Sequence, residues 1–431
     1  MARDSFEIAR TEIDIVELAT RAYGQEPVKR GSNLFISCMK DGGGADTDPS
    51  TVLYTSRNGF HCFHCGWHGS IIDFVMGWKS LSTPMEALAE LNRMYPALGL
   101  LNEEMRARAT HREIYLDKCK TRVESENIKI LGNKKLMSTL LEVRGISEMA
   151  VNEFHLGLST TTQFPRLSIP QFDSNGNATA FVTRRLVERD TGPRYWSMNI
   201  ALDGKTGKVL YNGEAQSSLD AIIVWRKGAY LYNLDRVGNG VIFDKCDIKT
   251  NDIMLVEGHL DVVAAWELGI NNAAAYGMKL LTDDQALLLE PFSCITLVPD
   301  TDAFDEVYNN VATIRQSMND KSITIVDLSL EYPDDPGGLS HVKDVGDVLK
   351  RSRRDGSVTK FVEALRNAET IEQWLYNREV APFLAMQKAF AYTRAQRLLR
   401  ISTEPISRAY LLSRIANDFD INPTILSFVT S

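Results

Sequence analysis

Apolar residues spaced three and four positions apart dominate both ends of the chain, and this spacing places them on one side of a helix. Near the N-terminus it predicts helices over residues 13–23, 70–78 and 83–95. Residues 101–126 carry alternating charges and few large apolar side chains, which predicts a helical or flexible linker. Residues 352–431 keep the helical spacing throughout, and we expect a packed helical subdomain there.

The middle of the chain follows a strand-like pattern instead. Alternating apolar and polar residues predict strands at 167–169, 178–185 and 221–225, with polar turn residues between them. Two uninterrupted apolar runs, 253–256 and 294–299, predict strands buried on both faces, as in a parallel sheet. The whole pattern is typical of a multidomain α/β protein.

A chain of 431 residues is long enough for several domains with sizeable cores. The changes of pattern predict five segments along it. They are a small N-terminal module over residues 1–100, a linker over 101–126, a mixed α+β segment over 127–245, a parallel-sheet α/β unit over 246–350 and a helical subdomain over 351–431.

Composition narrows the class of protein. The formal net charge of −8 argues weakly against a nucleic-acid partner, although basic residues outnumber acidic ones between residues 181 and 229. On composition alone, a solvated charged face is the simpler explanation of that stretch. No apolar run approaches the roughly 20 residues that span a membrane, and the N-terminus lacks the apolar core of a secretory signal. The six cysteines therefore indicate a reduced, intracellular protein with one metal cluster.

Acidic residues follow both of the predicted buried strands. Glu257 and Asp261 come after the first strand, and Asp300 and Asp302 come after the second. Since ligands bind beyond the carboxyl ends of such strands, these carboxylates are expected to converge on one crevice, where they repel each other. A divalent cation relieves that repulsion. The sequence therefore predicts a Mg²⁺ or Mn²⁺ site suited to phosphoryl or nucleotidyl transfer.

This arrangement resembles the toprim domain, which is shared by bacterial-type primases, topoisomerases and some nucleases. Glu257 matches the family's glutamate after the first strand, and Asp300 with Asp302 matches its D-x-D motif. The family's next acidic signature is degenerate in residues 343–347, Lys-Asp-Val-Gly-Asp. Asp344 matches it well, whereas Asp347 lies one residue later than the usual partner.

A metal-binding knuckle is predicted in the N-terminal module. Cys62 and Cys65 form a C-x-x-C pair that presents two thiolates to one metal, and Cys38 lies upstream of a glycine-rich loop. A redox pair is the alternative, but Cys38 and the loop favour a metal site. The segment 60–70 resembles the zinc-ribbon module of bacterial and phage primases. That family has a histidine or cysteine where this chain has Asp41, so one structural Zn²⁺ is expected on Cys38, Cys62, Cys65 and Asp41.

The identity of the fourth zinc ligand stays open. His61 adjoins Cys62 and is expected to point to the other side of its strand. His68 is sterically freer. Both histidines are alternatives to Asp41, and an incomplete site is a third possibility.

The segment between the zinc module and the acidic residues resembles the DnaG class of primases. Residues 227–234, Lys-Gly-Ala-Tyr-Leu-Tyr-Asn-Leu, are similar to a motif of that class. Pro193-Arg194-Tyr195-Trp196-Ser197 is similar to a second motif, and Phe181-Val182-Thr183-Arg184-Arg185 to a third. An Arg-Gly pair at Arg144 and Gly145 fits the start of the same domain. The resemblance extends from about residue 14 to residue 350.

The resemblance implies a zinc ribbon, a mixed α+β segment, a toprim unit and a helical subdomain, which together make an RNA polymerase core. It implies that Arg184, Arg185, Arg194 and Lys227 bind template phosphates or incoming ribonucleoside triphosphates. It also implies that Glu257, Asp300, Asp302 and Asp344 hold Mg²⁺ or Mn²⁺, with Glu257 as a general acid or base in an alternative role. Asp261 and Asp347 are expected to support the site.

The expected activity is RNA primer synthesis on single-stranded DNA during replication, within the cell and at the replication fork. A replicative helicase is a further possible partner, and the irregular motifs favour a phage or plasmid origin. A toprim nuclease and a non-catalytic zinc and nucleic-acid-binding protein are the alternatives. A primase–helicase is not expected, because Gly204-Lys205-Thr206 lacks the leading glycine of a phosphate-binding loop and lies in a predicted turn.

Overall fold

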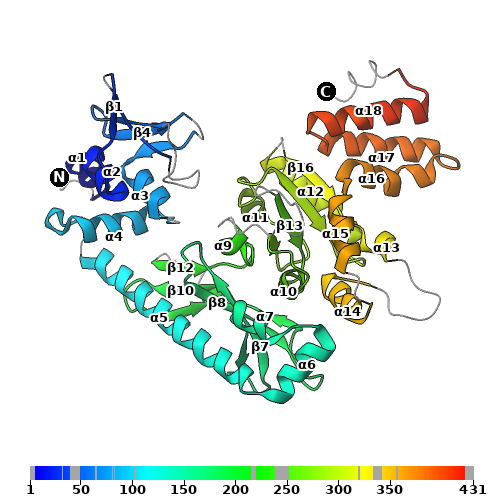
Figure 1. Cartoon of the computed structure of the whole chain (residues 1–431), viewed down its shortest axis with the longest axis horizontal. Helices are drawn as coiled ribbons and strands as arrows, with labels where there is room; N and C mark the ends of the chain where they lie inside the picture. Colours follow the sequence, from blue (N-terminus) through cyan, green and yellow to red (C-terminus); the bar gives the residue numbers. More distant parts are fainter. Residues whose placement is uncertain are drawn as a thin grey trace. The chain divides into compact units, whose positions relative to one another are not determined.

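The computed structural model describes all of the chain except residues 1–4, 32, 39–48, 64–65, 80, 82, 101–102, 215–219, 238–251, 319–320, 333–341, 356–357 and 423–431. The chain forms two compact units (Figure 1). The first contains Met1–Cys119, Asp173–Asn177 and Ile200–Val224, and the second contains the remaining residues. Among the helices of the described residues, none is both long and apolar enough to cross a membrane.

The first unit opens with a five-stranded antiparallel sheet whose strands follow chain order. Helices pack against it around a core that includes Phe60, Phe74 and Leu88. The predicted helix at 13–23 begins at Ile15, because the Asp14 carboxylate caps it by accepting the N–H groups of Val16 and Glu17. The strands are β1 (Val28–Arg30), β2 (Asn33–Ile36), β3 (Thr51–Tyr54), β4 (Gly59–Cys62) and β5 (His68–Ser70), and the helices are α1 (Ser5–Glu12), α2 (Ile15–Tyr23), α3 (Ile71–Lys79), α4 (Pro84–Met94) and the 3₁₀ turn η1 (Pro96–Leu98).

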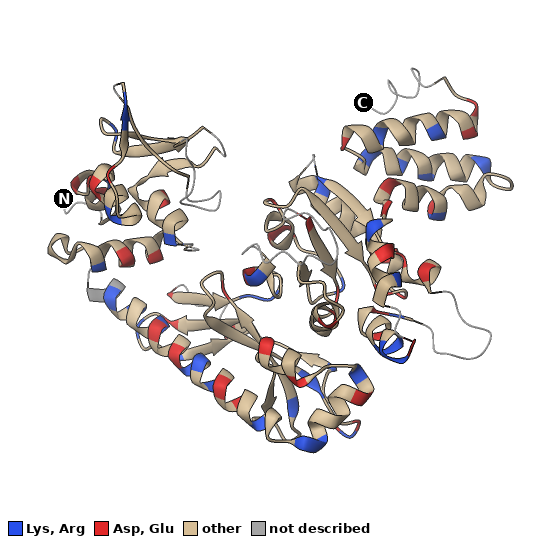
Figure 2. Cartoon of the chain, viewed as in Figure 1, with Lys and Arg blue, Asp and Glu red and all other residues tan. Residues whose placement is uncertain are grey.

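The predicted linker is helical. It forms most of α5 (Glu103–Leu131), along which acidic and basic residues alternate (Figure 2). The helix continues past residue 126, where the sequence pattern placed the end of the linker. The first unit also contains a three-stranded sheet with the order β11 (Val209–Tyr211), β10 (Ile200–Asp203) and β12 (Ala221–Trp225). In the turn after β10, Asp203 Oδ1 accepts the backbone N–H and the hydroxyl of Thr206, so Gly204-Lys205-Thr206 is the turn that its sequence predicts.

The second unit contains an antiparallel sheet that carries two of the three predicted strands of the mixed segment, those at 167–169 and 178–185. Its order is β6 (Gly157–Ser159), β7 (Arg166–Phe172), β8 (Ala178–Arg185) and β9 (Tyr195–Trp196). The helices α6 (Lys134–Arg144) and α7 (Glu148–Glu153) precede it in the chain. The strand predicted at 178–185 is confirmed at both ends.

The parallel sheet predicted around residues 253–256 and 294–299 is confirmed. Its order is β14 (Ala273–Ala275), β13 (Asp252–Val256), β15 (Cys294–Val298), β16 (Ser322–Ile325) and β17 (Glu369–Thr370). The first four strands are parallel, and Val256 pairs with Val298 at the carboxyl ends of β13 and β15. Tyr232 forms an antiparallel bridge to Ala275 on β14. The helices of this region are α9 (Leu234–Val237), α10 (His259–Glu267), α11 (Asp283–Leu287), α12 (Phe304–Ser317), α13 (Leu328–Glu331) and α14 (Val345–Asp355).

The prediction that residues 352–431 are helical throughout is wrong at one point. Glu369 and Thr370 form β17, which pairs antiparallel with β16 and adds an edge to the parallel sheet. Directly after this strand, Ile371 and Trp374 enter the same core as β13 and β15. The tail is therefore built onto the sheet, and it does not fold apart from it. Its helices are α15 (Val358–Arg366), α16 (Ile371–Glu379), η2 (Ala381–Phe383), α17 (Lys388–Ile401) and α18 (Pro405–Phe419).

A buried ion pair between α12 and α16 is expected to hold the tail in place. Arg315 Nη2 lies 2.9 Å from Glu372 Oε1, and both side chains are almost fully buried. Replacing Glu372 by alanine leaves the Arg315 charge buried without its anion, so we expect a loss of about 3–5 kcal/mol of unfolding free energy. Urea denaturation followed by tryptophan fluorescence measures this loss. Glu363→Ala removes an exposed glutamate from α15, and an equal loss in that control contradicts the prediction.

Candidate functional site

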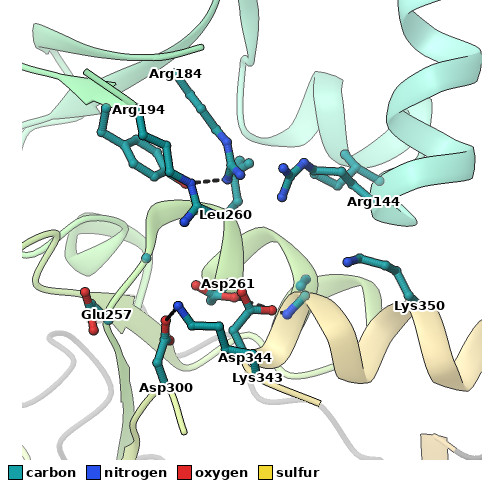
Figure 3. A pocket seen from close by; sticks show the side chains of 15 residues that line it. Arg144, Arg184, Arg194, Glu257, Leu260, Asp261, Asp300, Lys343, Asp344 and Lys350 are labelled. Carbon is teal, nitrogen blue, oxygen red and sulfur yellow. Dashed lines mark hydrogen bonds and ion pairs between the residues drawn. The ribbon is translucent and has the colours of Figure 1, made fainter. Parts of the chain in front are cut away.

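A cavity of about 280 Å³ lies in the second unit, beyond the carboxyl ends of β13 and β15. Carboxylates line one side of it, and guanidinium groups extend toward them from the other side (Figure 3). The lining residues are Arg144, Ile146, Arg184, Arg194, Tyr195, Glu257, Gly258, Leu260, Asp261, Ala264, Asp300, Lys343, Asp344, Gly346 and Lys350. The structure thus brings together four of the six predicted acidic residues.

Strand ends and helix starts position these acidic residues. Glu257 follows β13 directly, and Asp261 lies in the first turn of α10. Asp261 Oδ1 accepts the backbone N–H of Gly346 at 3.1 Å, which ties α10 to the start of α14. Asp344 Oδ1 accepts the N–H of Asp347 at 2.9 Å and so caps α14. A side chain at position 258 would clash with Asp261, since a Cβ there would lie 2.3 Å from Asp261 Oδ2, and this explains Gly258.

The carboxylates lie close enough to one another to raise each other's pKa. Burial and the charge of Asp300 raise the pKa of Glu257 to about 7. Burial and the charge of Asp344 raise the pKa of Asp300 and also that of Asp261. These groups therefore crowd negative charge into a partly dry space, which is the condition that a bound cation relieves.

A lysine lies among these acidic residues. Lys343 Nζ is 2.9 Å from Asp302 Oδ2 and 3.3 Å from Asp300 Oδ2. Its hydrogen bond to Asp302, followed by the charge of Asp300, raises the pKa of Lys343. Asp302 itself is 67% exposed and lies outside the cavity lining. Among the described residues, no three acidic, histidine or cysteine side chains come close enough together to hold one metal ion.

Basic residues form the opposite wall. Arg184, on β8, is almost fully buried and donates a hydrogen bond from Nη1 to the Tyr195 hydroxyl at 2.5 Å. Burial and the charges of Arg144 and Arg194 lower the pKa of Arg184. Because a guanidinium group stays protonated in proteins, this wall carries positive charge that favours an anion in the cavity.

Besides Asp302, three more of the predicted residues lie outside the cavity lining. Arg185 donates to the backbone carbonyls of Asp190 and Gly192, and so supports the loop before β9. Asp347 accepts from Lys350 Nζ at 2.5 Å and from the backbone N–H of Lys343 at 3.1 Å. Lys227 is exposed. The burial of His259, together with the charge of Lys227, lowers the pKa of His259 to about 4.

Three charged lining residues were not predicted as site residues from the sequence. They are Arg144, Lys343 and Lys350. Arg144 and Lys343 belong to motifs that carry the resemblance, so motif position was an available signal. Lys350 lies on α14 two turns after Asp344, and nothing in the local pattern distinguishes it from an exposed helical lysine.

The N-terminal module places two of its cysteines together. Cys38 and Cys62 are both buried. Burial raises the pKa of the Tyr23 hydroxyl, and the charges of the two cysteines raise it further, so both thiols lie near this phenol. The backbone N–H of Gly66 donates to the Cys62 carbonyl at 3.1 Å, which closes a tight turn after the cysteine. Soft thiolates on a tight turn are suited to zinc. Asp41 and Cys65 lie outside the described residues.

The two histidine alternatives lie on the other face of the sheet. His61 and His68 are paired across β4 and β5, and their ring centroids are 5.7 Å apart. Since neighbouring residues of a strand point to opposite faces, His61 points away from the side of Cys62, and so does its partner. His68 Nδ1 also forms a hydrogen bond with the Gly66 carbonyl at 2.7 Å.

Comparisons with known proteins agree with this geometry. Residues 1–101 match the family model of the CHC2 zinc finger. The chain is 24% identical over 320 residues to the DNA primase of Geobacillus stearothermophilus, which covers 69% of this chain and 51% of the relative. The chain is thus similar in sequence to DNA primases, and its N-terminal residues to the CHC2 zinc finger.

Solved primase structures have the same fold. The zinc-binding and RNA polymerase domains of the Aquifex aeolicus primase match 98% of this chain and 99% of that one, with a TM-score of 0.50 and 19% identity. A DnaG primase catalytic domain bound to single-stranded DNA matches 73% of this chain and 99% of that one, with a TM-score of 0.53 and 20% identity. The chain spans about half the length of the curated primase that it matches.

The raised pKa of Glu257 gives a testable pH dependence of stability. Between its ordinary pKa near 4.5 and about 7, the folded protein keeps a proton that the unfolded chain releases. Folding is therefore favoured at low pH, and this contribution is lost as the pH rises to 7. We expect Glu257→Gln to raise the melting temperature above that of the wild type at pH 8, and to raise it less at pH 5.

Thermal denaturation at both pH values, without added Mg²⁺ or Mn²⁺, measures this difference. Glu363→Gln makes the same chemical change at an exposed position and is expected to show no such pH dependence. An offset for Glu257→Gln that is equal at pH 5 and pH 8 contradicts the prediction.

Proposed function

We propose that this chain is an RNA primase that joins ribonucleotides on a single-stranded DNA template. The observation that carries the proposal is the cavity in which Glu257, Asp261, Asp300 and Asp344 face Arg144, Arg184, Arg194 and Lys350. A nucleoside triphosphate complexed with a divalent cation carries both charges that these walls favour. The relationship to DNA primases and the shared fold support the same activity.

The acidic wall is the proposed site of Mg²⁺ or Mn²⁺. Glu257, Asp300, Asp302 and Asp344 supply the carboxylate oxygens that these hard cations prefer. Burial and repulsion from neighbouring carboxylates raise the pKa values of Glu257 and Asp300, and a cation would relieve both effects. Such a cation, when bound, neutralises charge on the attacked phosphate. Asp261 holds the start of α14 through the N–H of Gly346 and so supports Asp344.

Glu257 is proposed to accept a proton in the reaction. Its pKa of about 7 leaves it partly ionised at neutral pH, which suits a group that takes the proton of an attacking ribose hydroxyl. Burial keeps the pKa of Glu257 high, and the charge of Asp300 raises it further.

The basic wall is proposed to bind phosphates. Arg184 is held in place by Tyr195, so its guanidinium group is oriented before a ligand arrives. Arg144, Arg194 and Lys350 line the same cavity. Lys227 is retained as a phosphate contact outside the cavity, whereas Arg185 is assigned the support of the loop before β9.

The zinc module is proposed to help hold the DNA template, with a replicative helicase as a further partner. One Zn²⁺ on Cys38, Cys62, Cys65 and Asp41 would fix the strands and turns of that module, which is a structural role.

A priming assay tests the proposed activity. The full chain is incubated with single-stranded DNA, labelled ribonucleotides and Mg²⁺ or Mn²⁺. We expect short template-dependent RNA from the wild type and a loss of at least about a hundredfold in Glu257→Gln and Asp300→Ala, because each removes a carboxylate from the reacting centre. Glu363→Gln is the matched control and is expected to keep full activity. Metal-dependent degradation of the DNA without RNA product would favour a toprim nuclease instead.

Metal analysis tests the zinc ligands. We expect one zinc per purified chain, and a content below about a tenth of that in Cys62→Ser, because three ligands hold structural zinc poorly. Inductively coupled plasma mass spectrometry measures the content. Asp41→Ala is expected to lose zinc, whereas His61→Ala and His68→Ala are expected to retain it. Loss of zinc in either histidine variant, with retention in Asp41→Ala, contradicts the assignment of Asp41.

A further inference from the structure

Lys343 is held against the D-x-D motif by its backbone as well as by its side chain. Its carbonyl accepts the N–H of Thr301, the residue between Asp300 and Asp302, at 3.0 Å. Its own N–H donates to Asp347 Oδ2 at 3.1 Å. The ammonium group then reaches the carboxylates of both Asp300 and Asp302. Hydrogen bonds of both the backbone N–H and the carbonyl of Lys343 therefore fix the position of this positive charge.

Asp347 gains an explanation from this arrangement. It is displaced by one residue from the position of its counterpart in toprim proteins, and it lies outside the cavity lining. Its two contacts, to the backbone of Lys343 and to Lys350 Nζ, instead hold a residue that borders the acidic cluster and one that belongs to the basic wall.

We propose that Lys343 is the internal counter-ion of the D-x-D carboxylates, and that a divalent cation binds there by displacing its ammonium group. This inference rests on the proposed function, because it concerns the same carboxylates. Oxygens that accept charge-assisted hydrogen bonds from an ammonium group are not free for a second cation. Lys343 occupies one oxygen of each carboxylate, and its charge repels a second cation, so we expect metal binding to break both ion pairs and Lys343 to set the affinity of the site for the metal.

The arrangement of the acidic residues supports this exchange. The carboxylates of Asp300 and Asp302 converge on the ammonium nitrogen, whereas no three acidic side chains of the described residues converge on a common point. Asp302 is largely exposed, so its side chain has room to turn from the lysine toward a cation. The positive charge of Lys343 thus reduces the repulsion between the carboxylates until a metal takes over that role.

Titration of the full chain with Mn²⁺ tests the exchange without any activity measurement. Lys343→Met removes the charge and keeps most of the side-chain length, and we expect it to bind Mn²⁺ about tenfold more tightly than the wild type. Lys343→Arg keeps the charge and is expected to stay within about threefold of the wild type. Calorimetry or the electron paramagnetic resonance of free Mn²⁺ measures these affinities. Unchanged or weaker binding by Lys343→Met overturns the proposal.

Lys279 provides a matched control for long-range charge. It pairs with Glu306, and its pKa is raised by that pair and by the charge of Glu257, but it has no ion pair with the D-x-D carboxylates. Lys279→Met therefore removes the same charge from the neighbourhood and breaks no contact with Asp300 or Asp302. We expect it to change Mn²⁺ affinity by less than about twofold. If Lys279→Met raises the Mn²⁺ affinity as much as Lys343→Met does, the effect comes from long-range charge alone, and the proposed displacement is overturned.

Chemical labelling observes the displacement directly in the wild type. An amine-acetylating reagent, followed by peptide mass spectrometry, gives the relative reaction rate at each lysine. We expect Mn²⁺ to speed the acetylation of Lys343 severalfold, because the displaced amine is no longer held by two carboxylates. The rate at Lys279 is expected to stay constant. An unchanged or slower reaction at Lys343 shows that the lysine stays on the carboxylates and overturns the proposal.

The failure of this inference is distinguishable from the failure of the proposed function. Asp300→Asn removes a charge from the D-x-D motif. If it binds Mn²⁺ as tightly as the wild type, the carboxylates are not the metal site and both proposals fall. If it loses Mn²⁺ binding while Lys343→Met binds like the wild type, the metal site stands and only the exchange is wrong.

Discussion

The register in which β13 pairs with β15 is the constraint on which the rest of the site depends. Because these parallel strands end side by side, with Val256 opposite Val298, Glu257 and Asp300 leave the sheet at the same edge. Helices α10 and α14 then start close enough for Asp261 to accept the N–H of Gly346, which adds two more carboxylates. The apolar strands are buried on both faces, so the sheet keeps its register although the groups at its edge repel one another.

The two walls of the cavity carry opposite charges, and the charge of each wall is not neutralised by residues of the same wall. Burial and the charge of Asp344 raise the pKa of Asp300, and burial with neighbouring guanidinium groups lowers that of Arg184. Lys343 bridges the two carboxylates of the D-x-D motif. A folded chain that keeps such repulsion gives up stability locally, and this cost is typical of sites that are completed by charged ligands.

Much of the fold could be predicted because its elements are long or strongly patterned. The strand at 178–185 and the acidic ends of β13 and β15 follow from local residue patterns alone. The two-residue strand β17 could not be predicted, because Glu369 and Thr370 carry no periodicity and pair only through β16. The contact of Lys343 with Asp300 and Asp302 was equally hidden, since it depends on how the start of α14 meets a distant strand end. The assignments of Asp41 and Cys65 to the zinc site stay predictions, as both lie outside the described residues.

The way in which the parallel sheet is closed limits how the chain can be divided. One of its edges is covered by Tyr232, which bridges to β14, and the other by β17, which pairs with β16. Both covering segments lie outside residues 246–350, the range that the sequence pattern marks as one domain. A fragment cut to that range would leave both edge strands with unpaired backbone N–H and C=O groups, which recruit strands from other molecules. The parallel sheet is therefore shielded from self-association by segments that lie outside the range predicted as its domain.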